Sequence, residues 1–362
     1  MSIRDIKIYF VDASGRASKN LIFCSVETDD GTVGWGEAYA IPRRERGIAE
    51  IMKGLSEMLM SLDDPTPWHF RRNVMDWYDA GHISIDFSSA ASAFEVALWD
   101  IQGKQAGKPL CELLGPVLTR SIPLYANMDP TTSDESIDQL VERCLAILQH
   151  GFNAVKIYPM SYGTLDDATE CVRRVRQAIG DENHLLIDVW ALASPVIALQ
   201  AARAFAPFDL YWFEEPVAGE RVDEMAEFSR QVDMPVVTGE RQVGIHHFRS
   251  VLERKAADIL NPDIVAAGGV QDMIEIGRMA QSYGARMSPH CWDSTLVATA
   301  AMVQTMAVLP NALIGETFPQ YATFCAEFGE LDIEIRDSTA IIGDAPGLGV
   351  RMDKDALAAH EV

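Results

Sequence analysis

Six acidic or imidazole side chains stand at or near the ends of short apolar runs in the second half of the chain. They recur at steps of 23 to 27 residues and are Asp188, Glu214, Glu240, Asp263, His290 and Glu316. One strand–helix unit has this length, and the strands of a closed parallel barrel all open onto one face. The step therefore predicts that these side chains meet in one barrel mouth. A single aspartate after an apolar run, Asp263 above all, is also typical of a helix N-cap.

Three consecutive members of this series are carboxylates, Asp188, Glu214 and Glu240. A set of oxygen ligands suits Mg²⁺, with water or substrate oxygens completing the octahedron, and Mn²⁺ could substitute. Three unpaired carboxylates in one mouth would repel one another and raise their pKa values. A divalent cation removes that conflict, so the sequence predicts a Mg²⁺ site.

His290 has no histidine partner at a zinc-site spacing, which argues against zinc. Asp263, one strand earlier, is placed to hold one ring nitrogen and so fix the tautomer and basicity of the imidazole. The pair is interpreted as a general base. The alternative, a core histidine with its hydrogen bonds satisfied, stays open because Pro289 and Cys291 flank the ring.

Lys156 and Tyr158 lie two residues apart on the predicted strand before Asp188, so their side chains share a face. In so apolar a run, Lys156 is expected to meet an anionic oxygen in the mouth rather than to reach out to solvent. Tyr158 is either a proton donor or a packed aromatic. A metal, a cation and a base together suit removal of the weakly acidic proton next to a carboxylate, because the resulting enediolate needs positive charge around it.

Repeated strand-then-helix units must position these groups. From about residue 119, short apolar strands alternate with longer amphipathic helices, in about eight units. This pattern predicts an α/β fold with a closed (β/α)₈ barrel over residues 119–330. Residues 331–362 return to short strands and turns, which we expect to pack away from the barrel.

Residues 1–118 show a different pattern of apolar and polar residues. The alternation over 2–10 predicts a half-buried strand, and Asp30-Gly31 between two alternating runs predicts a hairpin. Apolar spacing then predicts helices over 47–60 and 88–107. The first part of the chain is therefore expected to be a small α+β domain.

Charge and composition exclude several classes of partner. The 362 residues carry 30 Lys+Arg against 53 Asp+Glu, a net charge of −23, which repels nucleic acid and anionic membrane. The sequence has no apolar run long enough to span a membrane, and its first residues resemble a strand rather than a signal peptide. The six cysteines form no C-x-x-C pair. We therefore expect a reduced, cytoplasmic protein that binds any anionic substrate through a local cation or metal.

At these residues the sequence resembles the enolase superfamily, mandelate racemase subgroup. The motifs that carry the resemblance occur in family order over nearly the whole chain. They are DDGTVGWGEAY (29–39), ALWDIQGKQAGKPLCELLG (97–115), VKIY, LIDVW, FEEP, TGER, NPDIVAAGGV, SPH, IGE and PGLGV. The resemblance implies an N-terminal capping domain, a modified (β/α)₈ TIM barrel and a C-terminal segment that returns to the cap. It also implies a homo-oligomer, because relatives commonly assemble.

The resemblance also implies roles for the site residues. Asp188, Glu214 and Glu240 match the Mg²⁺ ligands, and Asp263 with His290 matches the His-Asp base. Glu316 matches the acid that hydrogen-bonds the substrate carboxylate, and Lys156 matches the first lysine of a K-x-K motif, which contacts that carboxylate. Arg241 of TGER is a further expected substrate contact.

Three departures from the family pattern narrow the function. Tyr158 stands where the second lysine of K-x-K would be, so the base of the opposite face is missing and simple two-base racemisation is doubtful. Ala266 and Ala267 stand where cycloisomerases and epimerases of the muconate-lactonizing subgroup carry a lysine. Trp190 replaces an asparagine that can bind the α-hydroxyl of the substrate, and together with Trp292 it predicts a partly aromatic pocket.

One histidine base with Mg²⁺ is the pattern of the acid-sugar dehydratases in this subgroup. The leading hypothesis is therefore a lyase that removes the α-proton of a small hydroxylated carboxylate and eliminates its β-hydroxyl, giving a 2-keto-3-deoxy acid. His290 would protonate the leaving group in a syn elimination and Tyr158 in an anti elimination. The alternatives are a racemase, epimerase or lactone cycloisomerase with Tyr158 as second acid, and a non-catalytic descendant that binds a carboxylate or a partner protein.

Overall fold

The N-terminal part of the chain forms a three-stranded antiparallel sheet. The computed structural model describes residues 2–79, 83–129, 134–191 and 194–362. The strands of this sheet, in spatial order, are β1 (Ile3–Val11), β2 (Leu21–Thr28) and β3 (Val33–Ala38). The predicted hairpin joins β2 to β3, and Gly31 in its turn has a φ of 85°, a conformation that glycine adopts without strain.

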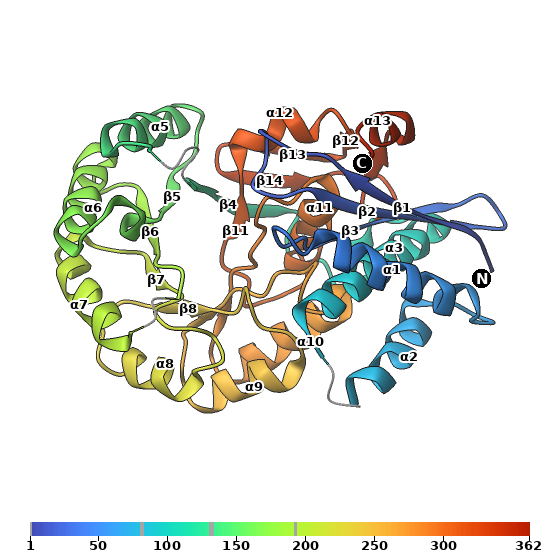
Figure 1. The fold of residues 1–362 in the computed structure, drawn as a ribbon, viewed down its shortest axis with the longest axis horizontal. Coiled ribbons are helices and arrows are strands. Elements are labelled where there is room, and N and C mark those ends of the chain that lie inside the picture. The colour runs from blue at the N-terminus through green and yellow to red at the C-terminus, as the bar shows by residue number, and fades with distance from the viewer. Residues whose placement is uncertain (1, 80–82, 130–133, 192–193) are drawn as a thin grey trace.

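Helices cover one face of this sheet (Figure 1). They are α1 (Glu45–Met60) and α3 (Ile85–Ala106), and α2 (Pro67–Asp79) packs against α3. The short α4 (Leu110–Leu114) follows α3 and packs against α3 and α11 (Leu296–Met306). The core between sheet and helices is apolar and includes Ile22, Met52 and Phe94. The strand and the two helices expected here from hydrophobic spacing are confirmed.

Helix α3 packs closely against β3 because the strand carries glycine on that face. A Cβ atom added to Gly34 would lie 2.1 Å from the carbonyl oxygen of Ala97, and one added to Gly36 would lie 1.8 Å from that of Ala93. The glycines of the GWGE stretch therefore permit a close contact between strand and helix backbones.

Strands β4 to β11 form one parallel series. Their bounds are β4 (Ser121–Asn127), β5 (Ala154–Ile157), β6 (His184–Asp188), β7 (Trp212–Glu214), β8 (Val236–Thr238), β9 (Ile259–Leu260), β10 (Arg286–Met287) and β11 (Gly315–Thr317). Each pairs in parallel with the next from β4 to β10, and β11 pairs in parallel with β4. A bridge between Met287 and Ala312 joins β10 to the segment before β11 and closes the barrel.

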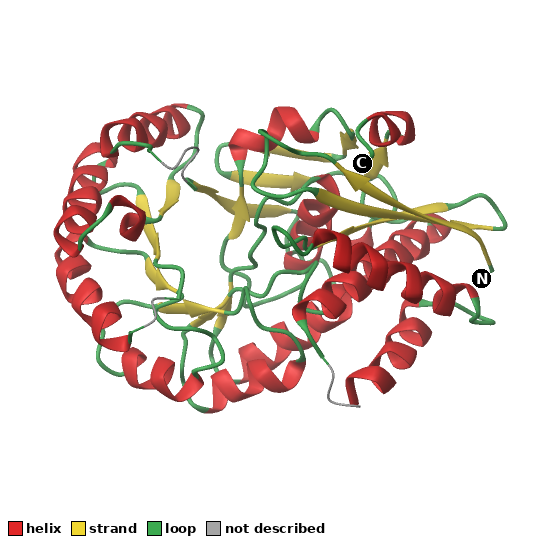
Figure 2. Cartoon of the chain, in the orientation of Figure 1, coloured by secondary structure: helices red, strands yellow, loops and turns green. Residues whose placement is uncertain are grey.

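Helices surround the barrel strands (Figure 2). They are α5 (Ile137–Gln149), α6 (Leu165–Ile179), α7 (Pro195–Phe205), α8 (Val222–Ser229), α9 (Ile245–Glu253), α10 (Gly269–Ser282), α11 (Leu296–Met306) and α12 (Ala322–Cys325), with 3₁₀ turns η1 (Pro159–Tyr162), η2 (Ala206–Phe208) and η3 (Pro319–Tyr321). Strand and helix alternate along the chain as the sequence predicted. The fold is a (β/α)₈ barrel with an α+β cap.

The C-terminal segment contacts both parts of the molecule. It contains β12 (Gly329–Leu331), β13 (Ile333–Arg336), β14 (Thr339–Ile342), β15 (Val350–Met352) and α13 (Lys354–Ala359). Beyond α13, the amide of Val362 donates to the carbonyl oxygen of Phe10 in β1. However, β14 pairs antiparallel with β4, so the expectation that this segment packs away from the barrel is wrong for that hairpin. We retain 1–118, 119–330 and 331–362 as the proposed division of the chain.

In the described parts of the chain, every helix is too short or too polar to cross a membrane.

The close approach of β3 and α3 generates a stability prediction. Replacing Gly36 by alanine forces a methyl group into the backbone of α3, and we expect the free energy of unfolding to fall by about 1–3 kcal/mol. Gly54→Ala in α1 is the matched control, because an added Cβ there meets nothing within 4 Å, and we expect it to be neutral or stabilising by up to about 1 kcal/mol. Denaturant titration of both variants measures the difference. Equal stability of the two would contradict the packing argument.

Candidate active site

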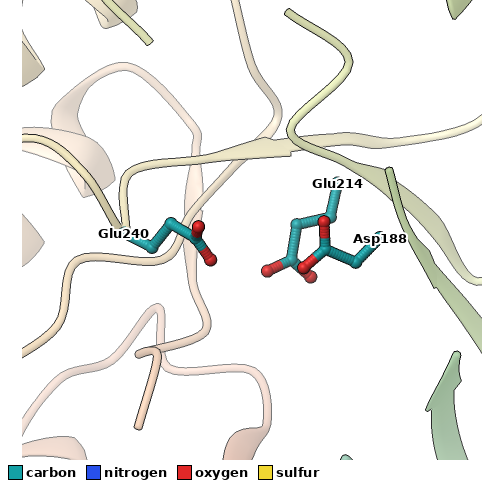
Figure 3. Close-up of side chains that lie close together, drawn as sticks. All are labelled: Asp188, Glu214 and Glu240. Carbon is teal, nitrogen blue, oxygen red and sulfur yellow. The ribbon is translucent and has the colours of Figure 1, made fainter. Parts of the chain in front are cut away.

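Three carboxylates converge at the mouth of the barrel (Figure 3). Asp188 ends β6, Glu214 ends β7, and Glu240 lies two residues beyond β8. All three are buried, and one oxygen from each lies within 4.8 Å of the others. Consecutive parallel strands thus deliver three oxygen donors to one point.

Because the cluster is buried, it is energetically costly for all three carboxylates to be ionised without a cation. Burial raises the pKa of Asp188 to about 7 against the opposing charge of Lys156, and it raises the pKa of Glu214 well above its usual value. Burial alone would also raise the pKa of Glu240, but the charges of His290 and Arg241 outweigh it and hold that pKa below its usual value. The donor set fits a hard divalent cation such as Mg²⁺, which would replace protons and repulsion with coordination.

Lys156 is fully buried among acidic groups on the barrel floor. Its ammonium lies 2.9 Å from Glu214 Oε1 and 2.8 Å from Glu316 Oε1, and 3.7 Å from Asp188 Oδ2. Burial would lower its pKa, but the charges of Glu214 and Glu316 raise that pKa well above its usual value. This lysine is therefore a permanent cation beside the carboxylate cluster.

Glu316 lies between Lys156 and the segment that contains His290, and it contacts both. Its Oε1 accepts from Asn127 Nδ2 at 2.6 Å, and its Oε2 accepts from the backbone amide of Cys291 at 2.7 Å. Burial would raise its pKa, yet Lys156 and His290 hold that pKa at about 2. Glu316 is ionised and fixed in position.

Asp263 and His290 are hydrogen-bonded to each other. The Nδ1 atom of His290 lies 2.8 Å from Asp263 Oδ2. The backbones of the β9 and β10 strands continue to pair as far as these two residues, which places the side chains side by side. The second aspartate oxygen accepts from the amide of Val265, so the carboxylate itself is held.

The other ring nitrogen of His290 faces the carboxylate cluster. Its Nε2 lies 3.2 Å from Glu240 Oε2 and 3.7 Å from Glu316 Oε2. Burial would lower the pKa of His290, but Glu316, Glu240 and Asp263 raise it to about 9. Neutralising Glu240 with a cation removes part of that effect and lowers the pKa of His290 toward a range suited to a base.

Aromatic side chains line the pocket above these groups. The pocket has a volume of about 720 Å³, and its aromatic lining consists of Tyr39, Tyr158, Trp190 and Trp292. Asn127 Nδ2 donates to the hydroxyl of Tyr158 at 2.7 Å, and the ring of Tyr158 lies 5.0 Å from that of Trp190. Trp190 is 51% exposed and has a φ of 53°, an uncommon backbone conformation for tryptophan.

Every residue singled out from the sequence lies in or beneath this pocket. Asp188, Glu240, His290, Tyr158, Trp190, Arg241 and Trp292 line it. Lys156, Glu214, Asp263 and Glu316 lie deeper and reach it through the contacts given above. Arg241 donates from Nε to Glu240 Oε1 at 2.9 Å, which places its guanidinium beside the carboxylate cluster.

Two asparagines of the site, Asn127 and Asn261, are not among the residues predicted from the sequence. Asn127, the last residue of β4, donates to Glu316 and to Tyr158. Asn261 donates from Nδ2 to Glu214 Oε1 at 2.8 Å. The sequence carries a signal for both, because each follows an apolar run at a strand end, but an uncharged amide in that position is less distinctive than a carboxylate or an imidazole.

The raised pKa values of the cluster predict proton-linked metal binding. Since Asp188 is largely protonated below pH 7, we expect Mg²⁺ affinity to rise with pH through 7 by about tenfold per unit for each proton displaced. Calorimetry in buffers of different ionisation enthalpy measures the protons released.

A pair of variants tests the predicted Mg²⁺ site. Asp188→Asn should abolish Mg²⁺ binding. Asp129→Asn removes another carboxylate that lines the pocket but lies outside the cluster, and it should retain binding. Affinity independent of pH, or equal losses in both variants, would contradict the assignment.

Comparisons with known proteins agree over nearly the whole chain. The family model "Mandelate racemase / muconate lactonizing enzyme, N-terminal domain" matches residues 10–115, and "Enolase C-terminal domain-like" matches residues 139–356. The chain is 30% identical over 359 residues to D-galactarolactone cycloisomerase of Agrobacterium fabrum, covering 96% of this chain and 93% of that protein. It is 27% identical over 360 residues to D-galactonate dehydratase of Cronobacter sakazakii, covering 94% and 90%.

Solved structures give the same result. An enolase from the environmental genome sequencing of the Sargasso Sea superposes with a TM-score of 0.95 at 35% identity, covering 100% of this chain and 97% of that one. A mandelate racemase/muconate lactonizing enzyme-like protein from Roseovarius sp. TM1035 superposes with a TM-score of 0.91 at 29% identity, covering 100% of this chain and 96% of that one. The chain belongs to the enolase superfamily, in its mandelate racemase subgroup.

Proposed function

We propose that this protein is a Mg²⁺-dependent acid-sugar dehydratase, which removes the proton α to a carboxylate and then eliminates the β-hydroxyl. The observation that carries the proposal is the Asp263–His290 pair, whose other ring nitrogen, Nε2, points at the same cluster as the buried Lys156. A base and a fixed cation on one pocket floor suit enediolate chemistry. The 27% identical relative named D-galactonate dehydratase supports the same reaction class.

Asp188, Glu214 and Glu240 would hold the Mg²⁺, and the bound cation would supply positive charge for the substrate carboxylate as it gains electron density. Lys156 supplies a second, permanent positive charge from the floor of the pocket. Glu316, fixed by Asn127 and Cys291, would take up a proton as the substrate binds and donate it in a hydrogen bond to the same carboxylate. The α-carbon then faces His290.

His290 takes the α-proton on Nε2, because its Nδ1 is held by Asp263. The electron pair of the broken C–H bond moves into the enediolate, and its return expels the β-hydroxyl, which leaves as water after gaining a proton. The enol product then tautomerises to a 2-keto-3-deoxy acid. The net change is the loss of one water molecule, with no oxidant or reductant.

A lactone cycloisomerase is the second candidate. It is favoured by the 30% identical relative named D-galactarolactone cycloisomerase. In that reaction Tyr158 would serve as the second acid. The residues Ala266 and Ala267, in place of a lysine, favour the dehydratase over the muconate-lactonizing type of chemistry.

Proton NMR in D₂O with Mg²⁺ and a panel of mono- and diacid sugars and their lactones tests the proposal. We expect a 2-keto-3-deoxy product from at least one acid. His290→Asn should lower kcat by about 10²- to 10⁴-fold, because it removes the base. Its control is His184→Asn, at the other end of the barrel strand β6 and outside the pocket. Lactone isomerisation without loss of water would support the second candidate, and metal binding without exchange of any α-proton would overturn both.

Tyr158→Phe separates the two stereochemical courses. Tyr158 lines the pocket from the end of β5, which is not a neighbour of the β10 strand that leads to His290, so we expect it to protonate the leaving hydroxyl. The variant should then lose about 10²-fold or more in dehydration while α-proton exchange into D₂O continues. Unchanged dehydration would instead assign both steps to His290.

A further inference from the structure

Residues 292–295, which follow His290 and Cys291, include a strained position and are bonded to the N-terminal cap. Asp293 has a φ of 44°, a left-handed conformation that is costly for a residue with a side chain. The segment leads into α11, whose N-cap residue, Thr295, makes no capping bond with its own side chain. Within the segment, Ser294 Oγ donates to the carbonyl oxygen of Trp292 at 3.2 Å. A strained segment keeps its shape only when its surroundings determine it.

Glu37 of the cap supplies this support. Its Oε1 accepts from the amide of Thr295 at 2.9 Å, and its Oε2 accepts from the Thr295 hydroxyl at 2.8 Å and from the amide of Ala298 at 3.0 Å. The carboxylate thus caps α11 from another part of the molecule and lies where the helix dipole favours negative charge. Glu37 is buried, so these bonds are shielded from water.

Two neighbouring residues of the cap hold the earlier part of the segment. The backbone amide and hydroxyl of Ser18 donate to Asp293 Oδ2, at 3.0 and 2.5 Å. The ammonium of Lys19 donates to the carbonyl oxygen of Trp292 at 2.8 Å and lies 4.3 Å from the centre of that ring. Every residue from 292 to 295 except Ser294 therefore has a bond to the cap.

The same cap strand also reaches the aspartate of the base pair. Tyr39, two residues beyond Glu37, has its ring centre 6.2 Å from that of His290. Its backbone amide donates to the carbonyl oxygen of Val265 at 3.3 Å, in the turn that follows Asp263. The end of β3 therefore touches the turns that carry both members of the pair.

We propose that Glu37 is a positioning residue that sets the orientation of His290 through Thr295 and the strained segment between them. The inference rests on the proposed role of His290 as the base. Without the Glu37 carboxylate, the amides of Thr295 and Ala298 lose their acceptors and the segment is free to relax toward an unstrained shape. The imidazole, three residues before Asp293, then moves relative to the substrate carbon.

Glu37→Gln tests the proposal with little change in volume. The variant has one acceptor oxygen, and its amide nitrogen would face an N–H group, so at least one bond to Thr295 or Ala298 is lost. We expect kcat to fall by about 10- to 100-fold, as for a small misplacement of a reacting group, with KM and the dissociation constant for Mg²⁺ within about twofold of wild type.

Asp100→Asn is the matched control for loss of a buried cap carboxylate. Asp100 is also fully buried and accepts from two backbone amides, those of Trp35 and Leu348. It also pairs with the Lys104 ammonium at 2.7 Å, and none of these contacts involves the base pair or its turns. We expect both variants to lose thermal stability. Only Glu37→Gln should lose kcat by more than about twofold, and equal losses of kcat would overturn the proposal.

A spectroscopic measurement separates this proposal from the proposed function. The Nδ1–H proton of His290, bonded to Asp263, should give a downfield resonance in the Mg²⁺-loaded protein, assigned by its absence in His290→Asn. The resonance should shift or broaden in Glu37→Gln and not in Asp100→Asn. If wild type exchanges no α-proton, the proposed function fails while this resonance still decides the positioning role. An unchanged resonance together with wild-type kcat in Glu37→Gln would overturn it.

Discussion

The molecule is organised around an excess of buried negative charge. Asp188, Glu214, Glu240 and Glu316 lie buried at one end of the barrel, with Lys156 among them. Isolated carboxylates do not remain ionised in such a place, so each needs a cation, a proton or a set of donors. The barrel meets this requirement by holding the groups on or just beyond its parallel strands, where their backbones cannot move apart. Protonation, a lysine and a divalent cation are then competing ways to balance the same charge.

The fold and most of the site follow from local patterns in the sequence. Steps of 23 to 27 residues identify the strand ends, and the parallel pairing from β4 to β11 brings Asp188, Glu214 and Glu240 together. The periodic spacing identifies the repeating strand–helix unit, and the geometry of a parallel barrel then identifies which strands are neighbours. The roles assigned to these side chains remain predictions.

Contacts between segments that are far apart in the chain have no comparable signal in the sequence. The pairing of β14 with β4 joins segments some two hundred residues apart, and nothing in the alternation of either strand specifies the partner. Glu37 likewise looks like an ordinary polar residue at the end of a strand, and only the folded molecule shows that it caps α11. The left-handed conformation of Trp190 is also set by its surroundings, since the sequence carries no glycine or asparagine there.

The side chains of the site come from several different strand–helix units, and this arrangement has an evolutionary consequence. A substitution at one strand end alters one interaction with the ligand and leaves the backbone of the other units in place. Tyr158 is an example. It lies directly after β5, and Lys156, two residues earlier on that strand, keeps its contacts with Glu214 and Glu316. Gene duplicates of such a barrel can therefore diverge in specificity one strand at a time, without passing through an unfolded intermediate.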